Sequence, residues 1–247
     1  MSAATVTFWD RLVTWFSTAD TWTRPGGLVD LIREHVWVSV LSTVVAVAVA
    51  VPLALWLAHV RRGRFVAVAV ANVGRAVPSF GIIVIAAVVF IRAGGSARFW
   101  PLVVALFALA IPPIFTNAYT AVVEVDQATV EAARGMGLTE LEVLRDVELP
   151  LATPLLLEGV RLAFTQVIAT ATLGAVVSSG GGLGRPIVDG FATFRSGGDV
   201  PLVGGAILVA LLTILADRGF SLAERAVVPA GVRHQLREAT PVITGRG

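Results

Sequence analysis

Five long apolar runs divide the chain into segments of about the length of a membrane crossing. They cover residues 36–60, 65–91, 99–123, 155–177 and 200–220. A helix needs about 20 apolar residues to cross the roughly 30 Å hydrocarbon core of a bilayer. The pattern therefore predicts an all-α membrane protein with about five transmembrane helices, which together make a transmembrane domain over residues 36–222.

Two of these runs contain residues that disturb a straight helix. Arg75 and Pro78 interrupt the second run, whose length exceeds one crossing but is too short for two. Pro112 and Pro113 lie near the middle of the third run, where two amide donors are missing. We therefore expect one crossing in the second run, and a kink or a break in the third.

Charged groups at the ends of the runs predict the orientation of the chain. Positive charges of short loops stay on the cytoplasmic side of a membrane. Charged groups follow the first, third and fifth runs: Arg61, Arg62 and Arg64; the charged stretch 124–148; and Arg218, Arg225, Arg233 and Arg237. With one crossing in the second run all three lie on one side, so we expect a multi-pass plasma-membrane protein with its N-terminus outside and its C-terminus in the cytoplasm. Residues 223–247 would form a cytoplasmic tail at the membrane surface.

Residues 1–35 precede the first run and mix apolar with polar side chains. The apolar ones are Phe8, Trp9, Leu12, Val13, Trp15 and Phe16. On the extracytoplasmic side, this segment is expected to form an amphipathic helix that lies on the membrane. A disordered tail is the alternative. The segment lacks a basic stretch followed by an apolar core and a cleavage site, so no cleaved signal peptide is expected.

Composition narrows the possible chemistry. The chain is 56% hydrophobic and 15% charged, with no cysteine, three histidines and 19 basic residues that are all arginine. Without lysine it cannot form a P-loop, and with no cysteine and only scattered histidines we expect neither a metal nor a cofactor. The arginines do not cluster on one face, which argues against nucleic acid. Apart from Asp217 near the end of the fifth run, Glu158 is the only acid inside a run, which disfavours an intramembrane enzyme with paired carboxylates.

The segment 124–152, between the third and fourth runs, has a different composition. Residues 124–148 hold seven acidic residues against two arginines, a net charge of −5. Asp126 is a candidate N-cap and Thr139 forms a capping box with Glu142, so two short helices are predicted. The second helix would end at Leu149-Pro150 and carry an apolar stripe of Leu138, Leu141, Leu144 and Val147. Such a hairpin suits docking into a groove of a partner protein, and a solvated connector is the alternative.

The same segment carries a spaced motif. Glu131-Ala132-Ala133 is followed after three residues by Gly137, and after nine more by Val147, one residue and Leu149-Pro150. This pattern resembles the EAA loop of ABC importer permeases, from which it departs only by Val147 in place of Ile. Further stretches resemble permeases of the glycine betaine, choline and related osmoprotectant importers: residues 131–138, 147–150, 170–173 and 181–184, Val77-Pro78-Ser79, and Asn117-Ala118-Tyr119-Thr120.

The resemblance implies a MetI-like permease fold and a subunit that works within a larger assembly. Its partners would be a cytoplasmic ABC ATPase, a second copy of the chain or a paralogous permease, an extracytoplasmic substrate-binding protein and the lipid bilayer. Glu131 would be the charged contact to the ATPase, and Gly137 a hinge at a close approach between the two short helices. Leu149 and Pro150 would set the return into the membrane. The chain itself would be non-catalytic and would form the pathway for osmoprotectants such as glycine betaine, choline, carnitine or proline betaine.

Two other transport functions remain open. The same architecture could import another small amino-acid-like or thiol-containing solute. A secondary transporter acting alone would have paired broken helices in two inverted halves. Here Pro78 and Pro112-Pro113 all lie in the first half of the chain, which weakens that reading.

Polar residues within or beside the runs are candidates for lining the translocation pathway. They are Arg75, Ser79, Asn117, Tyr119, Thr170 and Thr172. Hydrogen bonding between packed helices is the alternative role. A charged arginine within a span costs about 2.5 to 3.5 kcal/mol on insertion scales, so Arg75 should face the pathway or pair with an acid such as Glu158. Glu158 and Arg161 are three residues apart and are expected to pair, and the glycine-rich run 178–184 is expected to be a flexible turn.

Overall fold

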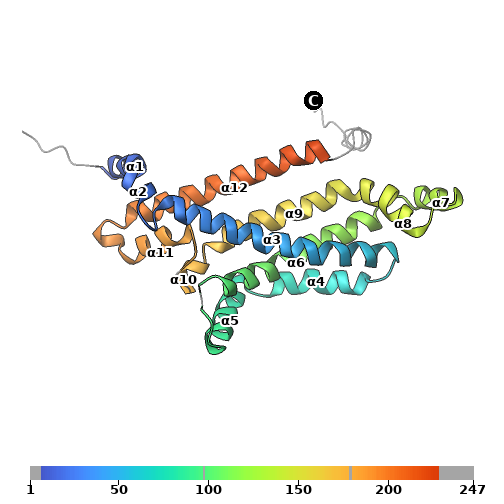
Figure 1. Ribbon diagram of the computed structural model, residues 1–247, viewed down its shortest axis with the longest axis horizontal. Helices are drawn as coiled ribbons and strands as arrows, with labels where there is room; N and C mark the ends of the chain where they lie inside the picture. Colours follow the sequence, from blue (N-terminus) through green and yellow to red (C-terminus); the bar gives the residue numbers. More distant parts are fainter. Residues whose placement is uncertain (1–6, 97, 178–179, 228–247) are drawn as a thin grey trace, which may run out of the picture.

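The protein is an elongated bundle of helices (Figure 1). The computed structural model describes residues 7–96, 98–177 and 180–227, without the side chains of Arg75 and Val227. Its helices are α1 (Phe8–Ser17), α2 (Ala19–Thr23), α3 (Leu28–His59), α4 (Arg64–Ala76), α5 (Ser79–Arg92), α6 (Trp100–Val123), α7 (Gln127–Gly135), α8 (Glu140–Glu142), a π-helical turn (Val143–Glu148), α9 (Leu149–Ala171), α10 (Gly174–Val177), α11 (Gly184–Ala192), a 3₁₀ turn (Phe194–Ser196) and α12 (Asp199–Val227). The predicted all-α class is therefore confirmed.

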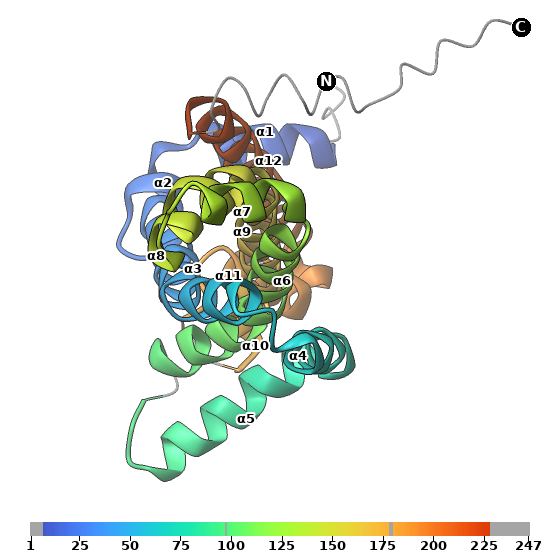
Figure 2. The same cartoon turned by 90° about the vertical axis from the view of Figure 1, so that its right-hand side faces the viewer.

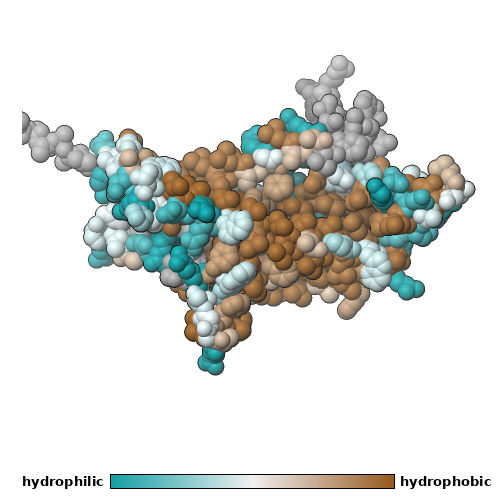
Figure 3. All heavy atoms as spheres, viewed as in Figure 1, coloured by the Kyte–Doolittle hydropathy of each residue, from teal (hydrophilic) through white to brown (hydrophobic). Residues whose placement is uncertain are grey.

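Within the described residues, four helical stretches are long and apolar enough to cross a membrane. They contain α3, α6, α9 and α12, and the pair formed by α4 and α5 makes a fifth crossing if it is counted as one broken span. An apolar band covers the middle of the molecule between two polar ends (Figure 3). The prediction of about five transmembrane helices is confirmed.

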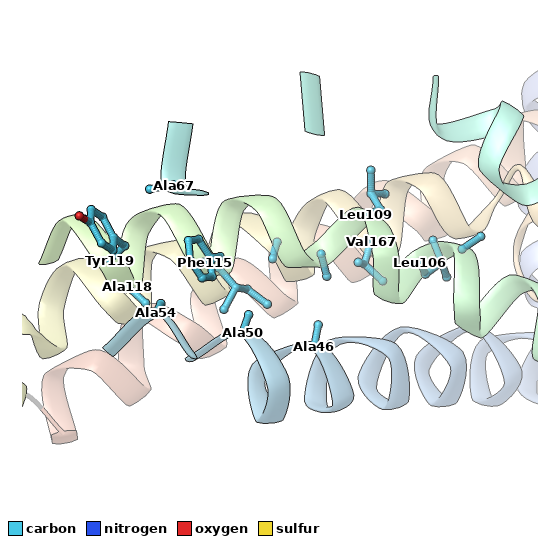
Figure 4. Packing of buried hydrophobic residues seen from close by; sticks show 14 of the residues in the cluster. Ala46, Ala50, Ala54, Ala67, Leu106, Leu109, Phe115, Ala118, Tyr119 and Val167 are labelled. Carbon is cyan, nitrogen blue, oxygen red and sulfur yellow. The ribbon is translucent and has the colours of Figure 1, made fainter. Parts of the chain in front are cut away.

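Helix α6 lies at the centre of the bundle, in contact with α3, α4, α5 and α9. The face that α3 turns inward is made of small residues at four-residue spacing, Ala46, Ala50, Ala54 and Ala58, each at most 1% exposed. Figure 4 shows Ala46, Ala50 and Ala54 on the α3 side of the core and Phe115 on α6 opposite them. Small side chains let membrane helices approach closely. Close packing then stabilises the association of the helices, because lipid tails are as apolar as the side chains and provide no hydrophobic driving force.

The second apolar run is broken into two helices. Helices α4 and α5 meet at 87°, and α5 turns away from the bundle (Figure 2). Val77 and Pro78 between them are extended, because proline offers no amide to the helix and disfavours helical backbone at the residue before it. Helix α4 packs tightly against α6, where a Cβ on Gly74 would lie 2.4 Å from the Cβ of Pro112.

The helix continues at two proline sites where an interruption is predicted. Pro112 and Pro113 lie inside α6, which continues without a break and is packed on several sides by other helices. Leu149-Pro150 does not end the helix before it either, because the π-helical turn leads directly into α9. In that turn the Leu149 amide bonds the Leu144 carbonyl, one residue further back than in an α-helix, which widens the turn ahead of Pro150.

The glycine-rich run is closely packed where it is described. Ser178 and Ser179 lie outside the described residues, but Gly180–Gly184 are buried. Gly181 and Gly182 have φ of +105° and +49°, and Cβ atoms there would lie 2.4 Å from the Ala175 amide nitrogen and 2.6 Å from the Cβ of His35. The prediction of a flexible turn is therefore wrong for this part, because the glycines serve close approach and left-handed backbone.

Helix α1 is held against the start of α12. Arg11 donates to both carboxylate oxygens of Asp199, with Nη1 3.1 Å from Oδ1. Leu12 is buried, and the Trp15 ring lies so close to Gly204 that a Cβ there would be 2.4 Å from it. Residues 8–17 are thus an ordered helix with a fixed position on the bundle.

Candidate coupling hairpin

The segment between α6 and α9 folds into a compact unit, called here the acidic hairpin (residues 127–148). It lies at the end of the molecule opposite α1, α2 and α11 (Figure 1). Its own small core consists of Val125, Val130, Ala133 and Val143, with Leu138, Val147 and Leu151 packed against them. Because side chains from both of its helices share this core, the hairpin is a unit in its own right and more than a solvated connector.

Both predicted helix starts in the hairpin are confirmed. The Asp126 carboxylate accepts hydrogen bonds from the amides of Ala128 and Thr129, each at 3.3 Å. The Thr139 hydroxyl accepts from the Glu142 amide, and the Glu142 carboxylate accepts from the Thr139 amide at 2.7 Å. These caps satisfy backbone donors at the first turns and fix where each helix begins.

The predicted apolar stripe is only partly correct. Leu138 and Val147 do pack against the hairpin core, but Leu141 is 73% exposed. Inward positions instead follow a spacing of four, at Val143, Val147 and Leu151. The wider π-helical turn favours this spacing, and a stripe at every third residue assumed a regular helix.

The motif residues divide into inner and outer positions. Ala133 is buried in the hairpin core, whereas Glu131 and Ala132 are exposed. Gly137 has φ of +93° and no atom within 4 Å of the position of a Cβ, so the backbone conformation, and not the predicted close approach, favours glycine there. The remaining three residues, Val147, Leu149 and Pro150, are half-buried where the hairpin joins α9.

Exposed apolar side chains accompany the acidic ones on the hairpin. Met136 is 76% exposed and Leu141 is 73% exposed. Exposed apolar groups beside carboxylates are what a protein-docking surface offers, since the apolar contacts supply affinity and the charges orient the partner.

The structure also reveals a polar network that sequence analysis missed. His59, in the last turn of α3, places Nδ1 2.6 Å from Oε2 of Glu148 and Nε2 3.1 Å from Oε2 of Glu140. Arg134 of α7 holds the same Glu140 carboxylate with two hydrogen bonds, of 3.0 and 2.8 Å. His59 and Glu148 are 89 positions apart, so no local spacing could have linked them.

Arg134 and Glu140 form the more exposed part of this network. The two hydrogen bonds to the Glu140 carboxylate raise the pKa of the Arg134 guanidinium above its ordinary value. Arg134 therefore stays charged, and its planar guanidinium fixes the Glu140 carboxylate, which also contacts His59.

The candidate pathway residues occupy varied positions. Tyr119 is 9% exposed and stacks against Phe115 within α6, with ring centroids 6.3 Å apart. Asn117 donates to the Pro113 carbonyl at 2.8 Å, and Thr172 donates to the Ala169 carbonyl at 2.7 Å. Ser79, Asn117, Thr170 and Thr172 are half-buried, and the side chain of Arg75 lies outside the described part.

The expected pair on α9 is present and has a third member. Arg161 lies 3.4 Å from Glu158 and 2.7 Å from Asp217 of α12. The stronger contact therefore joins two helices, which sequence spacing within α9 could not show.

Comparison with known proteins identifies the family of this chain. Residues 50–228 match the family described as binding-protein-dependent transport system inner membrane component. The chain is 34% identical over 216 residues to the choline transport system permease protein OpuBB of Bacillus subtilis, covering 87% of this chain and 95% of the relative. It is 33% identical over 211 residues to the glycine betaine/carnitine/choline transport system permease protein OpuCB of the same organism, covering 85% and 93%.

A more distant relative and a solved structure agree with these matches. The osmoprotectant import permease protein OsmW of Salmonella typhimurium is 29% identical over 209 residues, which cover 84% of this chain and 95% of the relative. The fold matches a chain of the inward-facing MetNI methionine ABC transporter with a TM-score of 0.70 at 22% identity, covering 82% of this chain and 96% of that chain. The MetI-like fold is thereby established, and the protein belongs to the inner membrane components of binding-protein-dependent transport systems, the multi-pass permeases of ABC importers.

Proposed function

We propose that the protein is the permease subunit of an ATP-driven importer for osmoprotectants such as glycine betaine, choline, carnitine or proline betaine. The acidic hairpin carries this proposal, because it presents the spaced motif on a compact unit at one end of the bundle. The names of the relatives support the class of solute. Import of another small amino-acid-like solute by the same architecture is the alternative.

The chain contributes no chemistry in this function. A separate ATPase binds the hairpin, with Glu131 as the charged contact and the exposed Met136 and Leu141 as apolar contacts. Closure of the ATPase pair moves the hairpin, and the pathway changes from inward to outward access. A second permease, either a copy of this chain or a paralogue, completes the pathway, and an extracytoplasmic binding protein delivers the solute.

The hairpin end is proposed to face the cytoplasm and the α1 end the outside. The Arg61, Arg62 and Arg64 group lies at the hairpin end, since Arg61 donates to the Val123 carbonyl at the end of α6 at 3.0 Å. This placement supports the positive-inside orientation. Helix α1 then lies on the outer membrane surface, with Trp9 and Val13 more than 60% exposed toward the lipid interface.

The proposed pathway residues are Arg75, Ser79, Asn117, Tyr119, Thr170 and Thr172. The break at Pro78 supports this assignment for Ser79, since half-helix ends at membrane depth are tolerated where they line a cavity or are buried in protein.

The first prediction concerns docking. The chain, tagged and extracted in mild detergent, should retain a P-loop ATPase together with a second permease and a binding protein. Glu131→Arg should lose the ATPase, because it places a positive charge where the carboxylate contacts the partner. Identification of co-purified proteins by mass spectrometry measures the loss.

Asp146→Arg is the matched control, because it makes the same charge change at another exposed acid of the hairpin. It should keep the ATPase. Retention of the ATPase by Glu131→Arg, or its absence from the unaltered chain, would contradict the docking role. Proteoliposomes holding the recovered complex then test uptake of glycine betaine, choline and carnitine, and uptake driven by an ion gradient without ATP would favour a secondary transporter.

A further inference from the structure

A buried contact joins the acidic hairpin to a helix that is remote from it in sequence. The Glu148 side chain is 0% exposed and the His59 side chain is 11% exposed, and 2.6 Å separates their nearest atoms. Oε1 of Glu148 has no hydrogen-bond partner among the described residues. All the hydrogen bonding of this buried carboxylate within the described chain therefore comes from His59, so its burial depends on that residue.

The same imidazole reaches the rest of the hairpin through its second nitrogen. Nε2 of His59 meets Glu140, which Arg134 of α7 holds with two hydrogen bonds. One side chain of α3 thus contacts the π-helical turn directly and α7 through the Glu140–Arg134 pair. Both arms of the hairpin are tied to α3 at a single point.

The topology gives this point a special position. Helices α6 and α9 connect to the hairpin through the chain itself, so any displacement of the hairpin reaches them directly. Helix α3 is joined to α4 by the turn at residues 60–63, and its covalent connection to the hairpin runs through α4, α5 and α6. His59 is therefore the polar tie through which the hairpin can pull on α3 at this end.

We propose that His59 is a positioning residue that transmits movement of the acidic hairpin to α3, with Glu148 as its partner. This inference rests on the proposed function for the source of the movement. The contact that fixes the hairpin to α3 is a property of the chain alone, so it can be measured without the ATPase.

The test uses two substitutions of His59, each of which keeps one of its two contacts, with Glu148 or with Glu140. His59→Asn retains a donor near the position of Nδ1 and can still meet Glu148, whereas His59→Gln retains one near Nε2 and can meet only Glu140. The complete transporter is reconstituted in proteoliposomes, and solute uptake is divided by ATP hydrolysed. We expect His59→Gln and His59→Ala to lower this ratio about tenfold while the ATPase stays bound, and His59→Asn to lower it by less than about threefold.

Arg145→Ala is the control, because it removes an exposed pair with Asp146 within the hairpin and should leave the ratio unchanged. An unchanged ratio in both His59→Gln and His59→Ala would overturn the proposal. So would an equal loss in His59→Asn and His59→Gln, since the Glu148 contact would then have no distinct role.

A second measurement separates this inference from the proposed function. Hydrogen exchange of amides 127–148 is followed in the full chain in lipid nanodiscs without partners. We expect faster exchange in His59→Gln than in His59→Asn, because the hairpin loses its tie to α3. Equal exchange in the two variants and the unaltered chain would overturn the tie, whether or not an ATPase binds. Failure of the unaltered chain to bind an ATPase would contradict the proposed function alone.

Discussion

At the scale of single residues, glycines set how closely the loop before α11 packs against the long helices. A Cβ on Gly184 would lie 2.1 Å from the carbonyl oxygen of Thr172, and one on Gly182 would lie 2.6 Å from His35. Backbone atoms cannot move aside as a flexible side chain can, so these positions exclude any larger residue. The tight loop thereby fixes the end of α9 relative to α3 and α11.

The second prediction follows from this packing. Gly184→Ala should destabilise the protein by about 2 kcal/mol through overpacking, which corresponds to a Tm lower by about 4–8 °C. Thermal unfolding in detergent measures the change. Gly135→Ala is the control, because nothing lies within 4 Å of its Cβ position and its Tm should not fall. Equal Tm values for the two variants would show that the loop relaxes without cost.

At the scale of elements, the apolar runs predicted the helices well and their breaks poorly. Uncharged length places α3, α6 and α12 because a bilayer imposes that length on any spanning helix. Interruptions depend on neighbours: Pro78 breaks a helix that ends at the bundle surface, while Pro112 sits inside α6, where packing holds the helix together. The capped helix starts at Asp126 and Thr139 could be predicted from the sequence, since a cap is formed between residues at most three positions apart.

The candidate site, too, could be predicted from the sequence only in part. The spaced motif located the hairpin, and composition marked it as acidic. The network of His59, Glu140 and Glu148 could not be predicted, because it depends on how α3 ends beside a turn that lies far along the chain. The π-helical turn that aims Glu148 inward has no signature in hydrophobic periodicity.

The third prediction concerns helix α1. Hydrogen bonds from the Thr7 amide and hydroxyl lower the pKa of Asp10 below its ordinary value. The ionised carboxylate thus stabilises the first turn above the unfolded value, near pH 4, and that stability is lost as the pH falls through the lower folded value. A nitroxide at Val13→Cys, the only cysteine in such a chain, should become more mobile below about pH 4.

Asp10→Asn supplies the comparison for this measurement. Without the Asp10 carboxylate, the mobility of the label should depend less on pH, and the remaining dependence should come from protonation of Asp199, which pairs with Arg11. A label at Phe191→Cys on α11 should be unaffected by Asp10→Asn, since Phe191 is exposed on a different helix. An unchanged spectrum at Val13→Cys on acidification would show that the apolar contacts of Leu12 and Trp15, and not the cap, hold α1 in place.

At the scale of the whole molecule, the apolar band and the two polar ends define one axis across the membrane (Figure 3). Contacts between α1 and α12 lie at one end and the acidic hairpin lies at the other. The two ends are therefore available to different partners, a binding protein outside and an ATPase inside, in the proposed orientation.

The fourth prediction tests this orientation. The natural chain has no cysteine, so single substitutions give unique labelling sites. Trp9→Cys and Met136→Cys replace exposed residues, 69% and 76% accessible, at opposite ends. A membrane-impermeant thiol reagent should label Trp9→Cys in intact cells and Met136→Cys only after permeabilisation, and the reverse pattern would invert the topology.

The uninterrupted passage from the hairpin into α9 has a geometric consequence. From Glu140 to Ala171 the chain stays helical, over about 48 Å at 1.5 Å per residue. If this stretch moves as one body, a tilt of about 10° at the hairpin end would displace the other end by on the order of 8 Å. Thr172 follows at the far end, and its carbonyl lies against Gly184. In the proposed orientation, a small rotation imposed from the cytoplasm therefore becomes a displacement at the outer end of the bundle.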